Sequence, residues 1–132
     1  MTEHRASCQC GAVQATSVND PIMVAACNCV ACQKKTGSAF GSGVFFKQAD
    51  VALSGDTWKW TRTAESGNEL TQHFCPNCGT TVFWMNAGRP GVVALSLGCI
   101  DGPIQQPNKV VWAEHQRDWL SFDESIPTSE QG

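Results

Sequence analysis

Seven of the eight cysteines fall into three closely spaced groups. The groups are Cys8-Gln-Cys10, Cys27-Asn-Cys29-Val-Ala-Cys32 and Cys75-Pro-Asn-Cys78, whereas Cys99 stands alone. Thiolates separated by one or two residues can reach a common tetrahedral ion, with Zn–S distances of about 2.3 Å. This spacing predicts metal sites rather than scattered buried thiols.

The Cys75-Pro-Asn-Cys78-Gly79 segment is typical of a zinc-binding turn. Proline and glycine favour a tight turn that frees backbone N–H groups for the sulfurs, and glycine tolerates a positive φ. One such turn supplies two ligands, so a closed structural site needs a second pair. Cys8 and Cys10 are the natural partners, because their motif also ends in glycine and precedes an expected strand. The alternatives are buried thiols or a disulfide, which a reducing compartment disfavours.

The CxCxxC triplet at Cys27, Cys29 and Cys32 predicts a different kind of site. Three protein ligands and an open position are typical of catalytic zinc, whereas structural zinc usually has four protein ligands. The alternative is a second structural site, completed by Cys99 or a histidine. A redox CxxC pair is a weaker interpretation, because no βαβ pattern surrounds the triplet. We expect the open site.

Many short β-rich runs, separated by turn signals, must position these cysteines. They span residues 12–18, 22–26, 44–46, 58–63, 80–85, 92–97 and 110–113. The best helical candidate, 115–122, is short. This pattern predicts one mainly β domain over residues 1–132, with a loose polar tail from about residue 127. Metal ions would suit such a chain, because many short strands make a poor deep core.

Composition limits the partners and the compartment. The net charge of -3 and the scattered lysines and arginines give no general attraction to nucleic acid or anionic membranes. The first residues lack the apolar stretch of a secretory signal, and no segment has the roughly 20 apolar residues that span a bilayer. We expect a cytoplasmic protein. Charged residues make up 16%, so a homo-oligomer contact would not be surprising.

The ordered cysteine motifs resemble those of the glutathione-dependent formaldehyde-activating enzyme family, which also contains centromere protein V. The resemblance covers about residues 5–119 and rests on 7–13, 27–32 running into Thr36-Gly-Ser38, 74–80 and 98–101. It implies the β-tent fold and two zinc ions: a structural one on Cys8, Cys10, Cys75 and Cys78, and a second one on Cys27, Cys29 and Cys32. Cys99 departs from the pattern, because serine or threonine is expected there.

The resemblance also implies an activity, the addition of glutathione to formaldehyde, which is a carbon–sulfur lyase reaction in reverse. A zinc ion with three thiolates is a weak Lewis acid, so we expect Cys27, Cys29 and Cys32 to hold an incoming thiol as a thiolate. The alternative is a non-enzymatic zinc module that binds a protein partner.

Other candidate site residues follow from the chemistry of this reaction. The alkoxide formed from the aldehyde needs a proton, and the chain has no tyrosine, so His73 and His115 are the candidate donors. Lys34 and Lys35 could receive the carboxylates of a glutathione-like thiol. Backbone and hydroxyl groups of Thr36 and Ser38 could bind the substrate beside the metal. For each, the alternative is an ordinary surface or packing residue.

Overall fold

The computed structural model describes residues 3–132. Its elements in chain order are β1 (His4–Ser7), β2 (Gln14–Ser17), β3 (Met23–Cys27), α1 (Val30–Thr36), β4 (Gly41–Lys47), β5 (Val51–Ser54), β6 (Trp58–Thr63), β7 (Glu69–Phe74), β8 (Thr81–Asn86), β9 (Val92–Ser96) and β10 (Lys109–Val111). Short 3-10 turns lie at Gln48–Asp50, Leu97–Cys99 and Ala113–His115. The prediction of a mainly β chain of short strands is confirmed.

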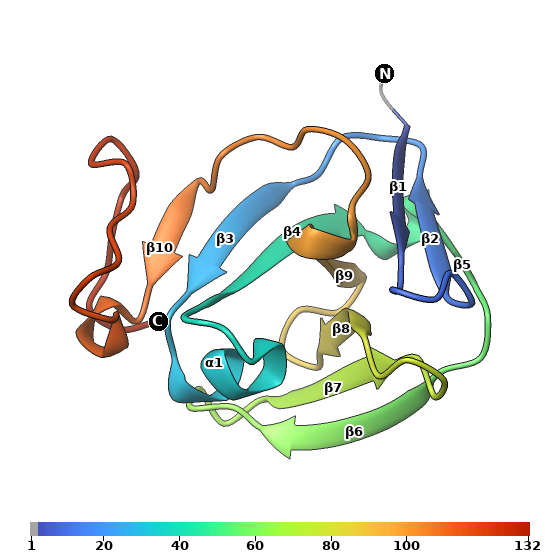
Figure 1. The fold of residues 1–132 in the computed structure, drawn as a ribbon, viewed down its shortest axis with the longest axis horizontal. Coiled ribbons are helices and arrows are strands. Elements are labelled where there is room, and N and C mark those ends of the chain that lie inside the picture. Colours follow the sequence, from blue (N-terminus) through green and yellow to red (C-terminus); the bar gives the residue numbers. More distant parts are fainter. Residues whose placement is uncertain (1–2) are drawn as a thin grey trace.

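Two sheets make up the fold (Figure 1). A three-stranded sheet has the order β1-β2-β5, and a seven-stranded sheet has the order β10-β3-β4-β9-β8-β7-β6. Neighbouring strands are antiparallel except β10 and β3, which are parallel. The large sheet therefore places the triplet, at the end of β3, on the same sheet as the distant strands β6 to β8.

The core lies between the two sheets. Ala6, Val13 and Ala15 reach it from the small sheet and its turn, and Val44 and Phe46 reach it from the large sheet. These side chains are almost fully buried. They follow the alternation of strand residues, in which successive side chains point to opposite faces. Cys8 and Cys75 belong to the same cluster, so the first cysteine group is continuous with the core.

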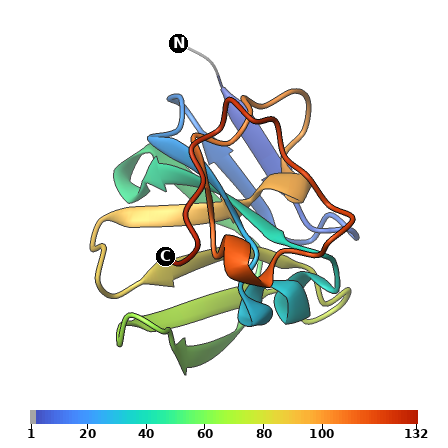
Figure 2. The ribbon, with the colours of Figure 1, turned by 90° about the vertical axis from the view of Figure 1, so that its left-hand side faces the viewer.

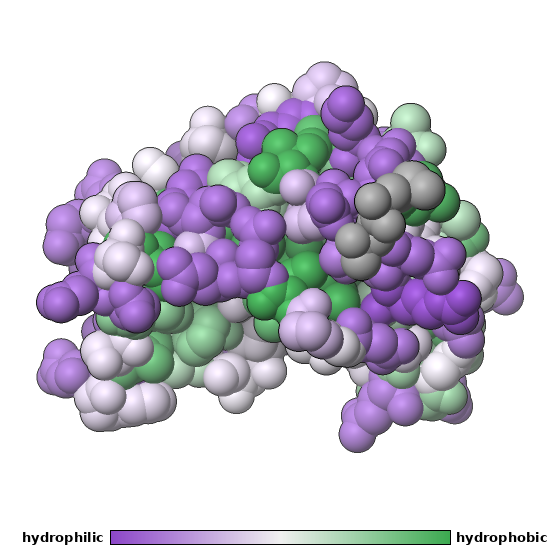
Figure 3. Space-filling model, turned by 90° about the horizontal axis from the view of Figure 1, so that it is seen from above, coloured by the Kyte–Doolittle hydropathy of each residue, from purple (hydrophilic) through white to green (hydrophobic). Residues whose placement is uncertain are grey.

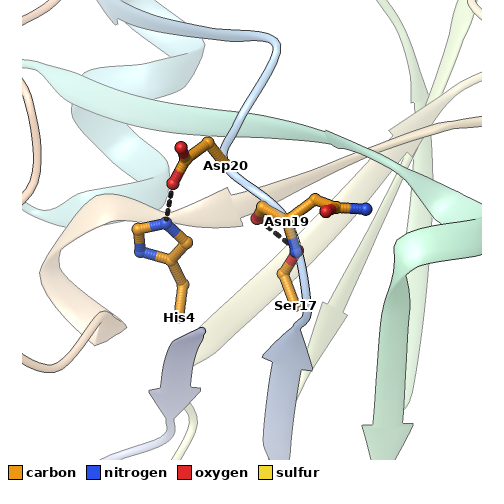
Figure 4. Close-up of polar contacts among 4 residues, drawn as sticks. All are labelled: His4, Ser17, Asn19 and Asp20. Carbon is orange, nitrogen blue, oxygen red and sulfur yellow. Dashed lines mark hydrogen bonds and ion pairs between the residues drawn. The ribbon is translucent and has the colours of Figure 1, made fainter. Parts of the chain in front are cut away.

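Polar contacts fasten the small sheet to the loop between β2 and β3 (Figure 4). The His4 ring contacts Asp20 through Nε2 at 2.9 Å, and it lies against Phe46 with 5.8 Å between ring centroids. The buried Ser17 hydroxyl donates to the Asn19 carbonyl at 2.8 Å. These contacts fix the first half of the loop that leads to β3.

The only α-helix of residues 3–132 is α1, which begins inside the cysteine triplet. Cys29 is its N-cap, and Gly37 ends it in the left-handed conformation with φ 67°. The segment 115–122, the best helical candidate in the sequence, contains no helix apart from the end of the 3-10 turn at His115. Instead, the Gln116 side chain donates to the Leu120 carbonyl at 2.8 Å within the segment and accepts from Asn28 Nδ2 at 3.4 Å.

The C-terminal segment is attached rather than loose, contrary to the sequence expectation. It runs beside β10 and the turn that follows it (Figure 2). Val110 donates to the Pro127 carbonyl at 2.9 Å and accepts from Ser129 N–H at 2.9 Å. Ala113 N–H donates to the Ser129 carbonyl at 3.0 Å. These backbone partners are set by tertiary pairing, which the polar composition of the segment does not reveal.

The surface mixes hydrophilic and hydrophobic areas (Figure 3). Exposed large apolar side chains include Trp58, Trp60 and Trp119. Within residues 3–132, no helix has the length and apolar character needed to cross a bilayer.

Candidate metal centres and the adjoining cleft

The first cysteine group has the geometry of a tetrahedral metal site. The sulfurs of Cys8, Cys10, Cys75 and Cys78 all lie within 4.8 Å of one another. Cys8 Sγ is 3.7 Å from Cys10 Sγ, which is 3.6 Å from Cys75 Sγ. Ligands at 2.3 Å from a tetrahedral zinc are roughly 3.8 Å apart. The four sulfurs therefore fit an ion of this kind.

The two turns that carry these cysteines also stabilise thiolates. Val13 N–H donates to Cys8 Sγ at 3.2 Å. Thr80 lies beside Cys78, with 3.2 Å between Oγ1 and Sγ, and also accepts from Gln9 N–H at 3.2 Å. Hydrogen bonds from the Thr80 hydroxyl and N–H lower the pKa of Cys78 to about 5. Thr80 thus links the two turns and favours the metal-binding form of a ligand.

The second cysteine group lies where β3 gives way to α1. The sulfurs of Cys27, Cys29 and Cys32 are within 4.8 Å of one another. Cys32 N–H donates to Cys29 Sγ at 3.3 Å. Hydrogen bonds from the Cys27 and Cys32 thiols lower the pKa of Cys29 to about 2, and the Arg62 charge acts in the same direction. The cluster can hold a metal ion with three thiolates.

Cys99 belongs to neither cysteine group among the described residues. Its thiol points to the Thr81 carbonyl at 4.0 Å, and its side chain packs against the core cluster that contains Cys8. Burial raises the pKa of this thiol. Within residues 3–132, no cysteine, histidine, aspartate or glutamate joins the three sulfurs of the triplet as a fourth ligand.

Asn28 and Gln33 hold the triplet in place. Asn28 is fully buried between Cys27 and Cys29, and it donates to the Val111 carbonyl from the backbone at 3.1 Å and from Nδ2 at 3.2 Å. Gln33 Nε2 donates to the Asn28 carbonyl at 2.8 Å. Because Val111 pairs with Cys27 in the sheet, β10 and α1 both fix the ligand-bearing segment.

A cleft of about 860 Å³ opens beside the triplet, which forms part of its wall. Four basic side chains line it, accompanied by two acidic ones: Lys35, Arg62, Arg89 and Lys109, with Glu65 and Glu114. Among the described residues, none of the four cations is in an ion pair. The cleft therefore offers free positive charge beside the thiolates, in a chain whose net charge is -3.

Two of these cations lie over aromatic rings. Lys35 Nζ is 3.2 Å from the centroid of the Trp84 ring, and the Arg89 guanidinium carbon is 5.4 Å from that of Phe45. Burial lowers the pKa of Lys35, while the nearby Cys32 thiolate opposes this effect. Lys35 and Trp84 also line a second cleft of about 650 Å³, which extends to Cys78 and Cys99.

The four predicted substrate-binding residues differ in whether they line a cleft. Lys35 lines both clefts, whereas Lys34 and Ser38 are exposed and line neither. Thr36 lines the second cleft, but its hydroxyl donates to the Cys32 carbonyl at 2.9 Å. This hydrogen bond helps to end α1, so the Thr36 hydroxyl is already engaged by the protein.

The two candidate histidines also differ in position. His73 lines neither cleft: it stacks on Phe83, with 4.4 Å between ring centroids, and its Nδ1 is 3.1 Å from Thr57 Oγ1. Burial lowers the pKa of His73. His115 lines the first cleft together with the triplet. Of the two, only His115 shares a cavity with the three sulfurs.

Sequence reasoning missed Arg62, Trp84, Arg89 and Lys109, because they come from separate strands and turns that only the sheet order brings together. One signal exists in β6, where Trp58, Trp60 and Arg62 alternate with polar residues and so share one face. The pattern does not show which face borders a cavity.

Comparison with known proteins assigns the family. The family model described as glutathione-dependent formaldehyde-activating enzyme matches residues 3–115. The chain belongs to this family. A crystal structure of a Rhodobacter sphaeroides protein, a structural genomics target, is similar to this family member with a TM-score of 0.59 and 16% identity, covering 76% of this chain and 90% of that chain. This likeness concerns the fold. A search of curated proteins found no match.

Proposed function

We propose that this family member is a cytoplasmic zinc-dependent carbon–sulfur lyase of the formaldehyde-activating type. It joins a glutathione-like thiol to a small aldehyde, or catalyses the reverse cleavage. The observation that supports this proposal best is the three-sulfur cluster in the wall of a large cleft, with no fourth protein ligand among residues 3–132. Three ligands and an accessible position are typical of catalytic zinc.

The two cysteine groups have separate roles in this proposal. Cys8, Cys10, Cys75 and Cys78 hold a structural zinc, and Cys27, Cys29 and Cys32 hold a second zinc at the cleft. When bound there, zinc would favour the thiolate form of an incoming thiol. The chain itself positions the aldehyde and the rest of the thiol molecule near that position, and proximity supplies much of the rate gain.

Recognition of the thiol rests on the cations of the cleft. Glutathione carries two carboxylates, and charge-assisted hydrogen bonds to lysine and arginine are the strongest available to such groups. Lys35, Arg62, Arg89 and Lys109 have no carboxylate partner among the described residues. Lys35 stands one helical turn after Cys32, so it is the cation that we assign first to a substrate carboxylate.

Replacing one ligand of the triplet tests the proposal. In Cys32→Ser, we expect the loss of one zinc equivalent and of catalysis, with an unchanged circular dichroism spectrum, because this site closes only a short loop. The reaction also proceeds without catalyst, so the rate is measured by NMR exchange between glutathione and its formaldehyde adduct, against a protein-free sample.

Cys99→Ser is the matched control, because it removes a partly buried thiol outside both clusters. It should keep both zinc ions and the wild-type exchange rate. Global unfolding of Cys32→Ser with loss of all metal would mean that the second site is structural, and would favour the alternative of a zinc module that binds a protein partner.

We further propose that the chain forms a homodimer through β6, the exposed edge strand of the large sheet. Trp58 and Trp60 are 64% and 57% exposed on it. An antiparallel pair of two such strands centred on Trp60 sets Trp58 opposite Arg62 of the partner subunit, which is a favourable cation–π pairing. Lys59 then faces a threonine, so no like charges oppose each other.

A further inference from the structure

We propose that His115, oriented by Glu114, exchanges the proton with the substrate oxygen during this reaction. The proposal rests on the proposed function and assigns the proton transfer that the cysteine clusters leave unassigned. His115 and the triplet line the same cleft, and among the described residues this is the only histidine that lines it. Imidazole is the side chain best suited to proton transfer near neutral pH.

The two ring nitrogens of His115 have different surroundings. Nε2 lies 3.6 Å from Glu114 Oε1, which is an ion-pair contact rather than a hydrogen bond, and Nδ1 has neither kind of partner within residues 3–132. The Glu114 carboxylate thus lies nearer Nε2, and Nδ1 is the ring nitrogen that we assign to the substrate. The ring also stacks on Trp112, with 5.9 Å between centroids and 19° between planes. The side chain remains 43% exposed and is therefore open to a substrate in the cleft.

The turn that carries His115 is fastened to the cysteine triplet. Gln33 Nε2 donates to the His115 carbonyl at 3.1 Å and to the Asn28 carbonyl at 2.8 Å. Asn28 lies between Cys27 and Cys29, and its Nδ2 is 3.4 Å from Gln116 Oε1. One glutamine side chain thus connects the backbone of the histidine with the backbone of the ligand segment, which fixes their relative position.

The backbone before His115 is also unusual. Trp112 has φ 58°, the only positive φ of a non-glycine residue in the part of the chain that the structure describes. Such conformations persist where the surrounding structure holds them, and they cluster at functional sites. Here the left-handed residue turns the chain from β10 into the 3-10 turn Ala113–His115 and brings both Trp112 and His115 to the cleft.

The proton transfer balances as follows. In the forward direction the thiolate sulfur forms a bond to the aldehyde carbon, and the electron pair of the C=O π bond moves to oxygen. The His115 imidazolium gives its Nδ1 proton to this oxygen, so a hydroxyl group results. In the reverse direction neutral His115 takes the hydroxyl proton, the carbonyl reforms and the C–S electron pair leaves with sulfur.

His115→Gln tests this role in the full zinc-loaded chain. We expect the exchange rate between glutathione and its formaldehyde adduct to fall by at least about 10²-fold, with unchanged zinc content and melting temperature. His73→Gln is the comparison variant and should keep the wild-type rate. The His73 side chain stacks on Phe83, on the sheet face opposite the one from which Trp84 lines the cleft. In His115→Ala, added imidazole should restore part of the rate, which a purely structural role of the histidine would not allow.

A binding measurement gives a readout independent of catalysis. S-(2-hydroxyethyl)glutathione, a stable thioether with a hydroxyl group, should shift the imidazole NMR signal of His115 more than S-ethylglutathione does. A wild-type chain without catalysis would contradict the proposed function and this role together. An active wild type with an equally active His115→Gln variant, or equal NMR shifts with both thioethers, would overturn the role of His115 alone.

Discussion

Lys35 shows at the scale of one residue how the cleft combines charge with burial. Its stem is partly buried, and its ammonium rests on the Trp84 ring near three thiol groups. Lys34, its neighbour in the sequence, is exposed and lines neither cleft. Two adjacent lysines, which the sequence does not distinguish, therefore differ in burial and in access to the clefts where an anionic thiol would bind.

This contrast gives a prediction with an internal control. Lys35→Met keeps the length and apolar stem of the side chain but removes its charge, so we expect the KM for glutathione to rise about tenfold or more, because a hydrogen bond to a charged group contributes roughly 1.5–3 kcal/mol. Lys34→Met should change KM less than twofold. Steady-state kinetics with both variants checks this, and equal KM values for the two would argue against carboxylate binding by Lys35.

At the scale of elements, the sequence predicted features that depend on local residue patterns, but not the pairing of distant strands. The CxxC and CxC spacings predicted both cysteine clusters, because ligand spacing is a local property of a turn. The short strands were also predictable from alternation and turn residues. The order of β6, β7 and β8 in the sheet that also contains β3 was not predictable, because strand pairing is non-local. The cleft cations Arg62 and Arg89 were missed for the same reason.

The C-terminal segment and the histidines show the same limit. Polarity from residue 127 onward suggested a loose tail, yet its backbone groups bond to Val110 and Ala113. His73 and His115 were equal candidates in the sequence, because nothing local tells which strand face or turn borders the cleft. In the structure, the shared cleft and the bond of Gln33 to the His115 carbonyl connect His115 with the triplet, whereas His73 lies outside the cleft.

The edge strand β6 leads to a prediction about assembly. If two copies pair through β6, Trp60→Ser should weaken the dimer by about 30-fold or more, because a central tryptophan typically contributes at least about 2 kcal/mol to an interface. Trp119→Ser is the control, since Trp119 is 76% exposed but lies outside β6. Sedimentation equilibrium measures both dissociation constants. A wild-type chain that stays monomeric at high micromolar concentration would contradict the pairing.

At the scale of the whole molecule, the two cysteine groups constrain the chain very differently. Cys10 and Cys75 are 65 residues apart, so an ion between them joins the small sheet to the turn before β8. Cys27 and Cys32 are only five residues apart. Closing the longer loop removes roughly 2 kcal/mol more chain entropy from the unfolded state than closing the shorter one. The first group is also continuous with the core, through the buried Cys8 and Cys75.

This difference predicts opposite responses to the loss of one ligand. Cys78→Ser should release the ion that joins distant segments, so we expect an insoluble protein or a melting temperature lower by 10 °C or more, because metal affinity and folding are coupled at such a site. Cys32→Ser should lose its ion and melt within a few degrees of the wild type.

Calorimetry with zinc analysis of both variants checks this prediction. Cys99→Ser, expressed in parallel, is the control, because it removes a core thiol without removing a metal ligand. A Cys78→Ser protein that binds two zinc ions and melts like the wild type would refute the four-cysteine site, and equal destabilisation by Cys78→Ser and Cys32→Ser would mean that both ions are structural.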